Sequence, residues 1–184
     1  MPRYLALLRG INVGGRAKVA MTDLRELAAA LGHAEVGTYI QSGNLLFTSA
    51  DADVVSLADT LEAEIAARLG VQPAVVVISA ADLAQVIKDN PFPDEANPKS
   101  LHAVFRRDAV DSDGIATVAA AVQRARDSGS RDDAVVVGRT LFLRTPDGLG
   151  RSDLAARLAR SSVQSAGTAR NWATVTKLMA MLGE

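Results

Sequence analysis

The sequence predicts an α+β protein with two tandem ferredoxin-like subdomains, each of element order βαββαβ, and an added C-terminal helix. Three observations predict this fold. Short β-rich apolar runs alternate with segments of helical periodicity. The same order of elements occurs twice along the chain, and the length of 184 residues suits two small subdomains. We place the first subdomain, with a linking helix, at residues 1–90 and the second, with the C-terminal helix, at residues 91–184.

The first half contains six elements and the helix that links it to the second half. Apolar runs bounded by turn residues predict strands, and Gln41-Ser42-Gly43-Asn44 between two such runs predicts a hairpin. Thr22 is expected to cap the first helix. The expected elements are strand 4–8, helix 22–31, strands 36–40 and 45–48, helix 57–69, strand 75–78 and the linking helix 80–88.

The second half repeats much of this order after Asn90-Pro91-Phe92-Pro93, where the prolines stop the linking helix. Gly138-Arg139 is expected at the tip of a second hairpin. The expected elements are strand 100–106, helix 115–126, strands 134–137 and 140–144, helix 153–160, a brief extended piece at 165–168 and the final helix 171–182.

Composition excludes several kinds of chemistry. The chain has no cysteine and only two histidines, His33 and His102. Disulfides, thiolate nucleophiles, cysteine zinc sites and multi-histidine metal centres are therefore excluded. We interpret His33 as an exposed residue of a helix-to-strand turn and His102 as a structural histidine within a strand.

Charge is distributed unevenly, although the formal net charge is −1. Residues 1–49 carry a net +2 and residues 139–184 a net +4, whereas residues 50–98 carry −7. The basic ends contain most of the polar motifs, so an anionic ligand is expected there. Aromatic residues make up only 4% of the chain, and no strand shows the paired aromatics of RNA-binding platforms, which argues against a nucleic-acid partner.

Hydropathy predicts a cytoplasmic protein that does not bind membranes. No segment approaches the roughly 18 continuous apolar residues of a membrane span. The apolar run at 4–8 is too short for an export signal. Sheet edges of the predicted fold can pair, which leaves a homodimer open.

The strongest candidate for ligand binding is the glycine-rich segment Leu8–Lys18. It joins a strand to a helix, and its glycines and arginines would offer backbone N–H groups and positive charge to an anion. Arg16 and Ala17 stand where a Walker A loop has Lys and Ser or Thr, and G-x-G-x-x-G is absent. The segment therefore shows no ATP, NAD or metal motif, and a purely structural connection is the alternative.

Three further segments place polar residues at loops or element ends. The hairpin tip 41–44 presents amide and hydroxyl groups, 148–153 leads glycines and an arginine into a helix, and 168–178 carries polar residues off its apolar stripe. Each has a structural alternative as a turn, a cap or a solvated face. The candidate ligand-binding residues of all four segments are Arg9, Asn12, Gly14, Gly15, Gln41, Ser42, Asn44, Arg151, Ser152, Arg170 and Asn171.

Six ordered motifs extend over nearly the whole chain. They are LLRGINVGG (7–15), TYIQSGN (38–44), NPFP (90–93), KSLHAVF (99–105), PDGLGRSDL (146–154) and TARNWATVTKL (168–178). With these motifs the chain resembles the bacterial family known as domain of unknown function 1697. The resemblance implies two tandem ferredoxin-like subdomains, and it implies no reaction, cofactor or catalytic residue.

These observations favour a binding module that holds an anionic small molecule or nucleotide-like ligand in a cleft between the two subdomains. One alternative is an enzyme that acts on a phosphorylated or carboxylated metabolite without cysteine or metal, with arginines and backbone N–H groups stabilising charge. Another is an RNA-binding or protein-interaction module. The sequence assigns no catalytic residue and no cofactor.

Overall fold

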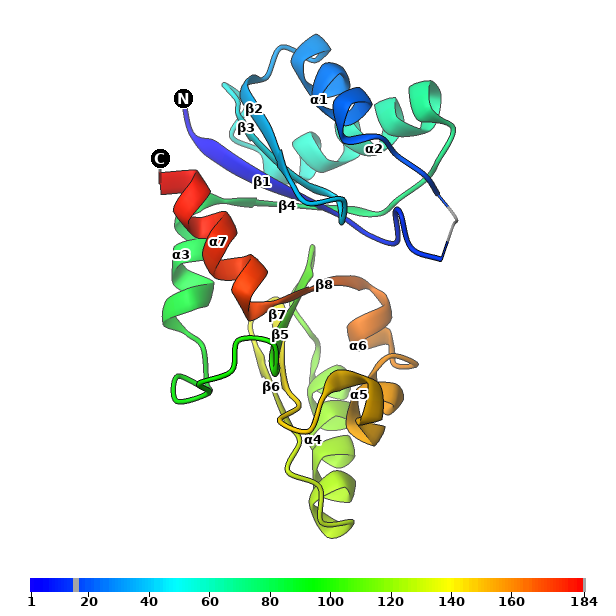
Figure 1. Cartoon of the computed structure of the whole chain (residues 1–184), viewed down its shortest axis with the longest axis vertical. Coiled ribbons are helices and arrows are strands. Elements are labelled where there is room, and N and C mark those ends of the chain that lie inside the picture. Colours follow the sequence, from blue (N-terminus) through cyan, green and yellow to red (C-terminus); the bar gives the residue numbers. More distant parts are fainter. Residues whose placement is uncertain (15–16, 184) are drawn as a thin grey trace. The chain divides into compact units, whose positions relative to one another are not determined.

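The computed structural model describes residues 1–14 and 17–183, and it divides into two compact units. One unit contains Met1–Gln85 together with the chain from Leu178 onward, and the other contains Val86–Lys177. Helix α3 (Ala80–Lys88) and helix α7 (Trp172–Gly183) each belong partly to one unit and partly to the other. Each unit contains one four-stranded antiparallel sheet (Figure 1).

In the first unit, two helices pack on one face of the sheet (Figure 1). The strand order is β2-β3-β1-β4, so the first strand of the chain lies between the third and the fourth. All three pairings are antiparallel. The elements are β1 (Arg3–Leu8), α1 (Met21–Ala30), β2 (Ala34–Tyr39), β3 (Asn44–Thr48), α2 (Val54–Leu69) and β4 (Val75–Ser79).

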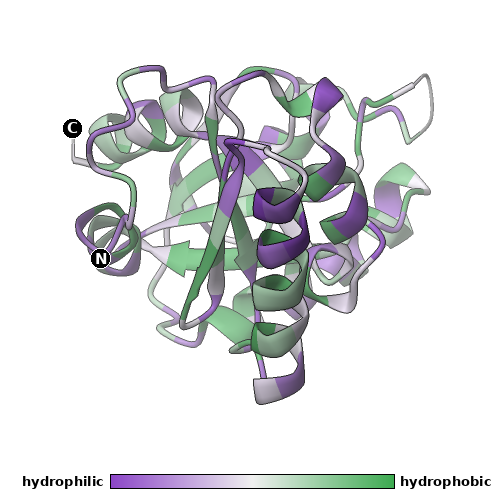
Figure 2. Ribbon diagram, turned by 90° about the horizontal axis from the view of Figure 1, so that it is seen from below, coloured by the Kyte–Doolittle hydropathy of each residue, from purple (hydrophilic) through white to green (hydrophobic). Residues whose placement is uncertain are grey.

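The second unit repeats this strand order as β6-β7-β5-β8, again with antiparallel pairings. The elements are β5 (Leu101–Arg106), α4 (Ser112–Asp127), β6 (Asp133–Val137), β7 (Thr140–Arg144), the 3-10 turn η1 (Leu149–Arg151), α5 (Asp153–Leu158), α6 (Ser162–Ser165) and β8 (Gly167–Asn171). In both units the helices carry hydrophilic and hydrophobic residues along their length, as expected for helices that cover a sheet (Figure 2).

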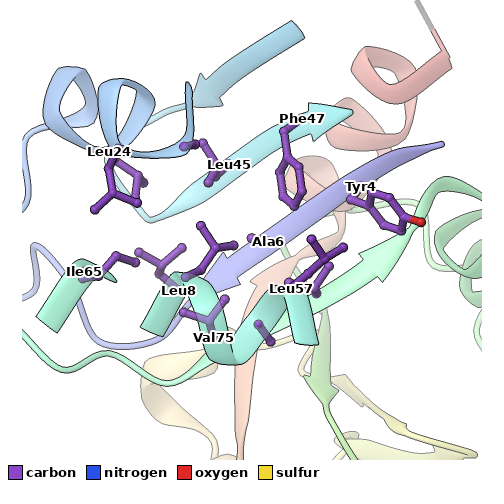
Figure 3. Packing of buried hydrophobic residues seen from close by; sticks show 14 of the residues in the cluster. Tyr4, Ala6, Leu8, Leu24, Leu45, Phe47, Leu57, Ile65 and Val75 are labelled. Carbon is purple, nitrogen blue, oxygen red and sulfur yellow. The ribbon is translucent and has the colours of Figure 1, made fainter. Parts of the chain in front are cut away.

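Strand β1 is buried on both faces of the sheet, and this burial explains its continuous apolar run. Tyr4, Ala6 and Leu8 contribute to the core beneath α1 and α2 (Figure 3). Leu5 and Leu7 alternate to the other face of the sheet and are also fully buried. A strand buried on both faces needs apolar residues at every position, and each buried leucine contributes about 1.5 to 3 kcal/mol.

The predicted elements agree with the structure except in a few places. Thr22 does not cap α1, because the helix already begins at Met21 and its N-cap is Ala20, which makes no side-chain cap bond. The short helix α6 was not expected, and β8 lies further along the chain than the predicted extended piece. None of the described helices is both long enough and apolar enough to traverse a lipid bilayer.

Candidate functional site

The glycine-rich loop and the hairpin tip of the first unit are joined by the side chain of Asn12. Its Nδ2 donates to the carbonyl oxygens of Val19 and Gln41, both at 2.9 Å. Its Oδ1 accepts from the backbone N–H of Val19, also at 2.9 Å. Because Gln41 lies 29 residues away in the sequence, this one amide fixes two loops against each other.

The backbone of Asn12 also suits this role. Its φ is 55°, in the left-handed region where asparagine is among the few tolerated side chains. Its N–H donates to the carbonyl oxygen of Ala17 at 3.1 Å, which closes the loop on itself. Both N–H groups of the side-chain amide are used within the protein. Asn12 therefore positions the loops rather than offering its amide to a ligand.

The side chain of Asn44, which is fully buried, stabilises the hairpin tip through hydrogen bonds. Its Nδ2 donates to the Tyr39 carbonyl at 3.0 Å and to the Ser42 Oγ at 2.9 Å. The carbonyl of Gly43 accepts from the N–H of Leu8 at 2.8 Å, so the tip is bound to the end of β1. Of the remaining tip residues, Gln41 is exposed and Ser42 is half-buried.

We use the term loop surface for the exposed or half-buried residues Arg9, Gly14, Gln41 and Ser42. The loop that carries Arg9 and Gly14 and the hairpin tip that carries Gln41 and Ser42 are the two that Asn12 joins. A guanidinium group, an amide and a hydroxyl are suitable partners for the oxygens of a phosphate or carboxylate. The predicted residue Gly15 lies outside the described residues.

The candidate residues of the second unit lie at the start of α5. Ser152 is buried and caps this helix, because its Oγ accepts from the N–H of Ala155 at 2.9 Å. The same hydroxyl donates to Asp132 Oδ2 at 2.7 Å. Arg151 is exposed in the preceding turn η1. The hydroxyl of Ser152 is therefore used by the helix cap and by Asp132, whereas the Arg151 side chain is exposed to solvent.

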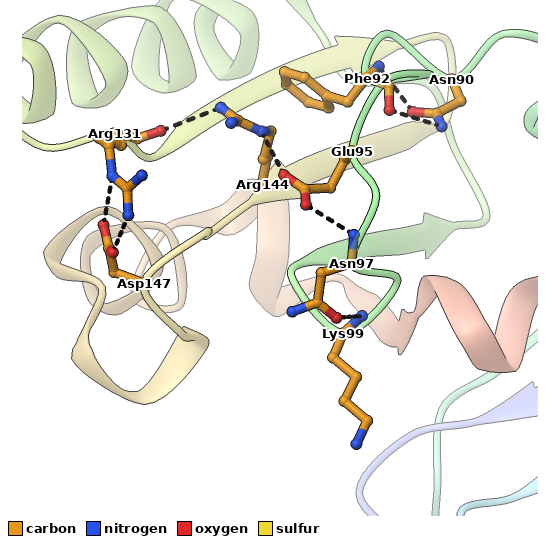
Figure 4. Close-up of polar contacts among 8 residues, drawn as sticks. All are labelled: Asn90, Phe92, Glu95, Asn97, Lys99, Arg131, Arg144 and Asp147. Carbon is orange, nitrogen blue, oxygen red and sulfur yellow. Dashed lines mark hydrogen bonds and ion pairs between the residues drawn. The ribbon is translucent and has the colours of Figure 1, made fainter.

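Asp147, next to this turn, forms an ion pair with Arg131 (Figure 4). Its hydrogen bond with Arg131 lowers the pKa of the Asp147 carboxyl, and the positive charge of Arg151 adds to the effect. Arg144 in turn donates to Glu95 at 2.8 Å and to the Arg131 carbonyl at 3.3 Å. These contacts join residues far apart in the sequence, so no local pattern could have predicted them.

Arg170 and Asn171 are both used by the fold. Arg170 is 8% exposed in β8, and its Nη1 donates to the Thr168 Oγ1 and to the Ala169 carbonyl, each at 2.8 Å. Burial lowers the pKa of the Arg170 guanidinium to about 10, so the group stays protonated at neutral pH. The Oδ1 of Asn171 accepts from the N–H of Thr174 at 2.8 Å, in the first turn of α7.

A pocket of about 550 Å³ lies against α2 and is lined by Asp59, Glu62 and the segment 72–74. Glu62 accepts from the N–H of Val75 at 2.7 Å, so one carboxylate of the pocket ties α2 to β4. Two carboxylates make this pocket unsuited to an anion. Within residues 1–14 and 17–183, no group of three or more His, Asp or Glu side chains is placed to hold a metal ion.

Both histidines are partly buried, which corrects the expectation that His33 is exposed. The His33 ring packs against Phe47 with ring centroids 4.5 Å apart and the ring planes tilted by 33°, and burial lowers the pKa of His33. Burial also lowers the pKa of His102, whose Nδ1 is buried and makes no hydrogen bond within the described part of the chain. The charge of the Asp51 carboxylate offsets part of this lowering at His33. His33 Nε2 and His102 Nδ1 are buried and make no hydrogen bond within the described residues, so neither nitrogen belongs to a catalytic pair.

Lowering the pH from 7 to 5 is expected to reduce the free energy of unfolding. Both histidine pKa values lie below 6.5 in the folded protein, so the unfolded chain binds more protons in the window just below that value. Their contribution is complete above pH 6.5 and is lost as the pH falls through the folded values. Urea unfolding at pH 7, 6 and 5 measures this slope, and His102→Gln should reduce it. An unchanged slope in a variant lacking both histidines would contradict the assignment.

The structure describes two α+β units, each with a four-stranded antiparallel sheet, and the loop surface is the candidate site of the first unit. A family model described as protein of unknown function (DUF1697) matches residues 1–142, and the chain belongs to this family. The chain is also similar to the conserved bacterial protein SP0830 from Streptococcus pneumoniae, with 26% identity, a TM-score of 0.75 and 98% of each chain covered. A comparison with curated proteins found no match.

Proposed function

We propose that this protein binds a small anionic molecule, and that the loop surface of the first unit is the binding site. The observation that carries the proposal is the Asn12 side chain, which fixes the glycine-rich loop to the hairpin tip through bonds of 2.9 Å. A site whose backbone is already fixed at Asn12, Val19 and Gln41 loses less conformational entropy when a ligand binds. Arg9 supplies the charge, and Gln41 and Ser42 supply hydrogen-bonding groups.

We also infer that each unit is a ferredoxin-like subdomain and that the pair arose as a tandem arrangement. Support comes from the two sheets, whose strand orders β2-β3-β1-β4 and β6-β7-β5-β8 correspond position by position. The division at residues 90 and 91, the binding roles of Arg151 and Arg170, and a cleft shared by all the candidate loops stay predictions.

Replacing Arg9 by glutamine tests the binding proposal. Adenosine monophosphate and glucose 6-phosphate serve as probes, and binding is followed by NMR amide shifts of the full chain. Saturable shifts are expected at Gly14, Gln41 and Ser42. Arg9→Gln should weaken affinity about tenfold or more, because a charge-assisted hydrogen bond contributes about 1.5 to 3 kcal/mol.

The matched control is Arg68→Gln. Arg68 is also an exposed arginine of the first unit, but it pairs with Glu64 one turn away on α2 at 2.7 Å. The control should bind both probes as the unchanged protein does. Equal weakening in the two variants, or shifts that spread over the whole surface without saturating, would contradict a site at the loop surface.

A further inference from the structure

We propose that the groove between α4 and α5 in the second unit binds a small organic phosphate, at a site separate from the loop surface. The groove encloses about 320 Å³, within the roughly 300 to 1,000 Å³ typical of ligand sites. Both helices belong to the same unit and lie side by side (Figure 1). The groove is lined by Thr117, Ala120, Ala121, Arg124, Arg157, Leu158 and Ser161.

The charge of the groove is positive and uncompensated. Arg124 reaches it from α4 and Arg157 from α5, and none of the seven lining residues is acidic. Within the described part of the chain, no hydrogen bond or ion pair engages either guanidinium group. Arg126, two residues after Arg124 on α4, differs because it pairs with Asp133 at 2.9 Å. Two arginines without partners on opposite walls can bind a phosphate from both sides.

We use the term floor for the apolar lining residues Ala120, Ala121 and Leu158, of which the two alanines are small. Thr117, Ala120, Ala121 and Arg124 follow the spacing of a single helical face. Ala120 and Ala121 leave room where larger side chains would fill the space between the helices. The hydroxyls of Thr117 and Ser161 already donate to the Asp113 and Leu158 carbonyls. The donors for a ligand are therefore the two arginines, and its carbon skeleton would rest on the alanines.

Phenyl phosphate combines both features of this ligand and is the first probe, with inorganic phosphate as the second. In NMR titrations of the full chain, phenyl phosphate should shift the amides of Thr117, Ala120 and Ser161 saturably. Arg124→Gln and Arg157→Gln should each weaken binding about tenfold. Ala120→Leu should also weaken it by filling the floor without changing any charge.

Arg160→Gln is the matched control, because Arg160 is an exposed arginine close in sequence to Arg157 but does not line the groove. This control should leave the affinity for phenyl phosphate unchanged. Equal weakening by Arg160→Gln would overturn the proposal in favour of diffuse attraction to a basic surface. Inorganic phosphate should bind more weakly, and equal affinity for the two probes would overturn the assignment of an organic ligand. Because the reporting amides belong to the second unit, failure here is separate from failure at the loop surface.

Discussion

Gly43→Ala is expected to lower the free energy of unfolding by about 2 to 4 kcal/mol, combining backbone strain with overpacking. Gly43 has a φ of +76°, where a side chain is strained. An added Cβ would lie 2.8 Å from the Leu8 Cβ and 2.9 Å from the Ile11 Cδ1. Both neighbours are buried, so neither can move away without disturbing the core. Urea unfolding followed by circular dichroism measures the loss.

Gly70→Ala separates the two causes. Gly70 follows α2 in the same unit with a φ of +68°, but an added Cβ there meets nothing within 4 Å. This control should lose only the backbone term, about 1 to 2 kcal/mol. If both variants lowered the free energy of unfolding by the same amount, the close approach of the hairpin tip to β1 would contribute nothing to the cost of Gly43→Ala.

Replacing Asn12 is expected to release the two loops that form the loop surface. Asn12→Gly keeps a residue that tolerates the φ of 55° but removes three hydrogen bonds, and it should cost about 1 to 3 kcal/mol. Asn12→Ala adds backbone strain and should cost about 1 kcal/mol more. The local readout is amide hydrogen exchange at Val19, whose N–H donates to Asn12 Oδ1 and should exchange faster in both variants.

Asn97→Gly is the control for Asn12. Asn97 is exposed, and its Oδ1 accepts from the N–H of Lys99, two residues along the same turn (Figure 4). Its replacement should change stability by less than about 1 kcal/mol and leave the exchange of Val19 as it was. Unchanged exchange at Val19 in Asn12→Gly would show that the amide does not fix the loops.

The regular elements could be predicted because their signals are local. The five apolar residues from Tyr4 to Leu8 predict a buried strand, and α3 occupies the expected 80–88. The hairpin before β3 was predicted from its turn residues, although β2 ends at Tyr39 because Ile40 has a φ of 48°. Helix α6 has only four residues, too few to show a periodic pattern.

The roles of the candidate residues could not be predicted in the same way. Asn12 and Arg9 look alike in the sequence as polar residues of one loop. Only the bond from Asn12 to the carbonyl of Gln41 shows that its amide is already used. Arg170 lies within a strand rather than in a loop. It is buried, whereas sequence reasoning expects a charged side chain to be exposed to solvent. Contacts over long sequence distances decide which polar groups the fold itself uses.

The membership of α7 in both units has a consequence for synthesis on the ribosome. The first unit includes the chain from Leu178 onward, and Arg3 in β1 donates to the carbonyl of Leu182 at 3.2 Å. That part of the helix is translated after Val86–Lys177 have been made. At about 5 to 20 residues per second, the first unit waits roughly 5 to 20 s for this last segment, although its four strands have already been made. The nascent first unit therefore passes this interval incomplete, a period in which a chaperone could act on it.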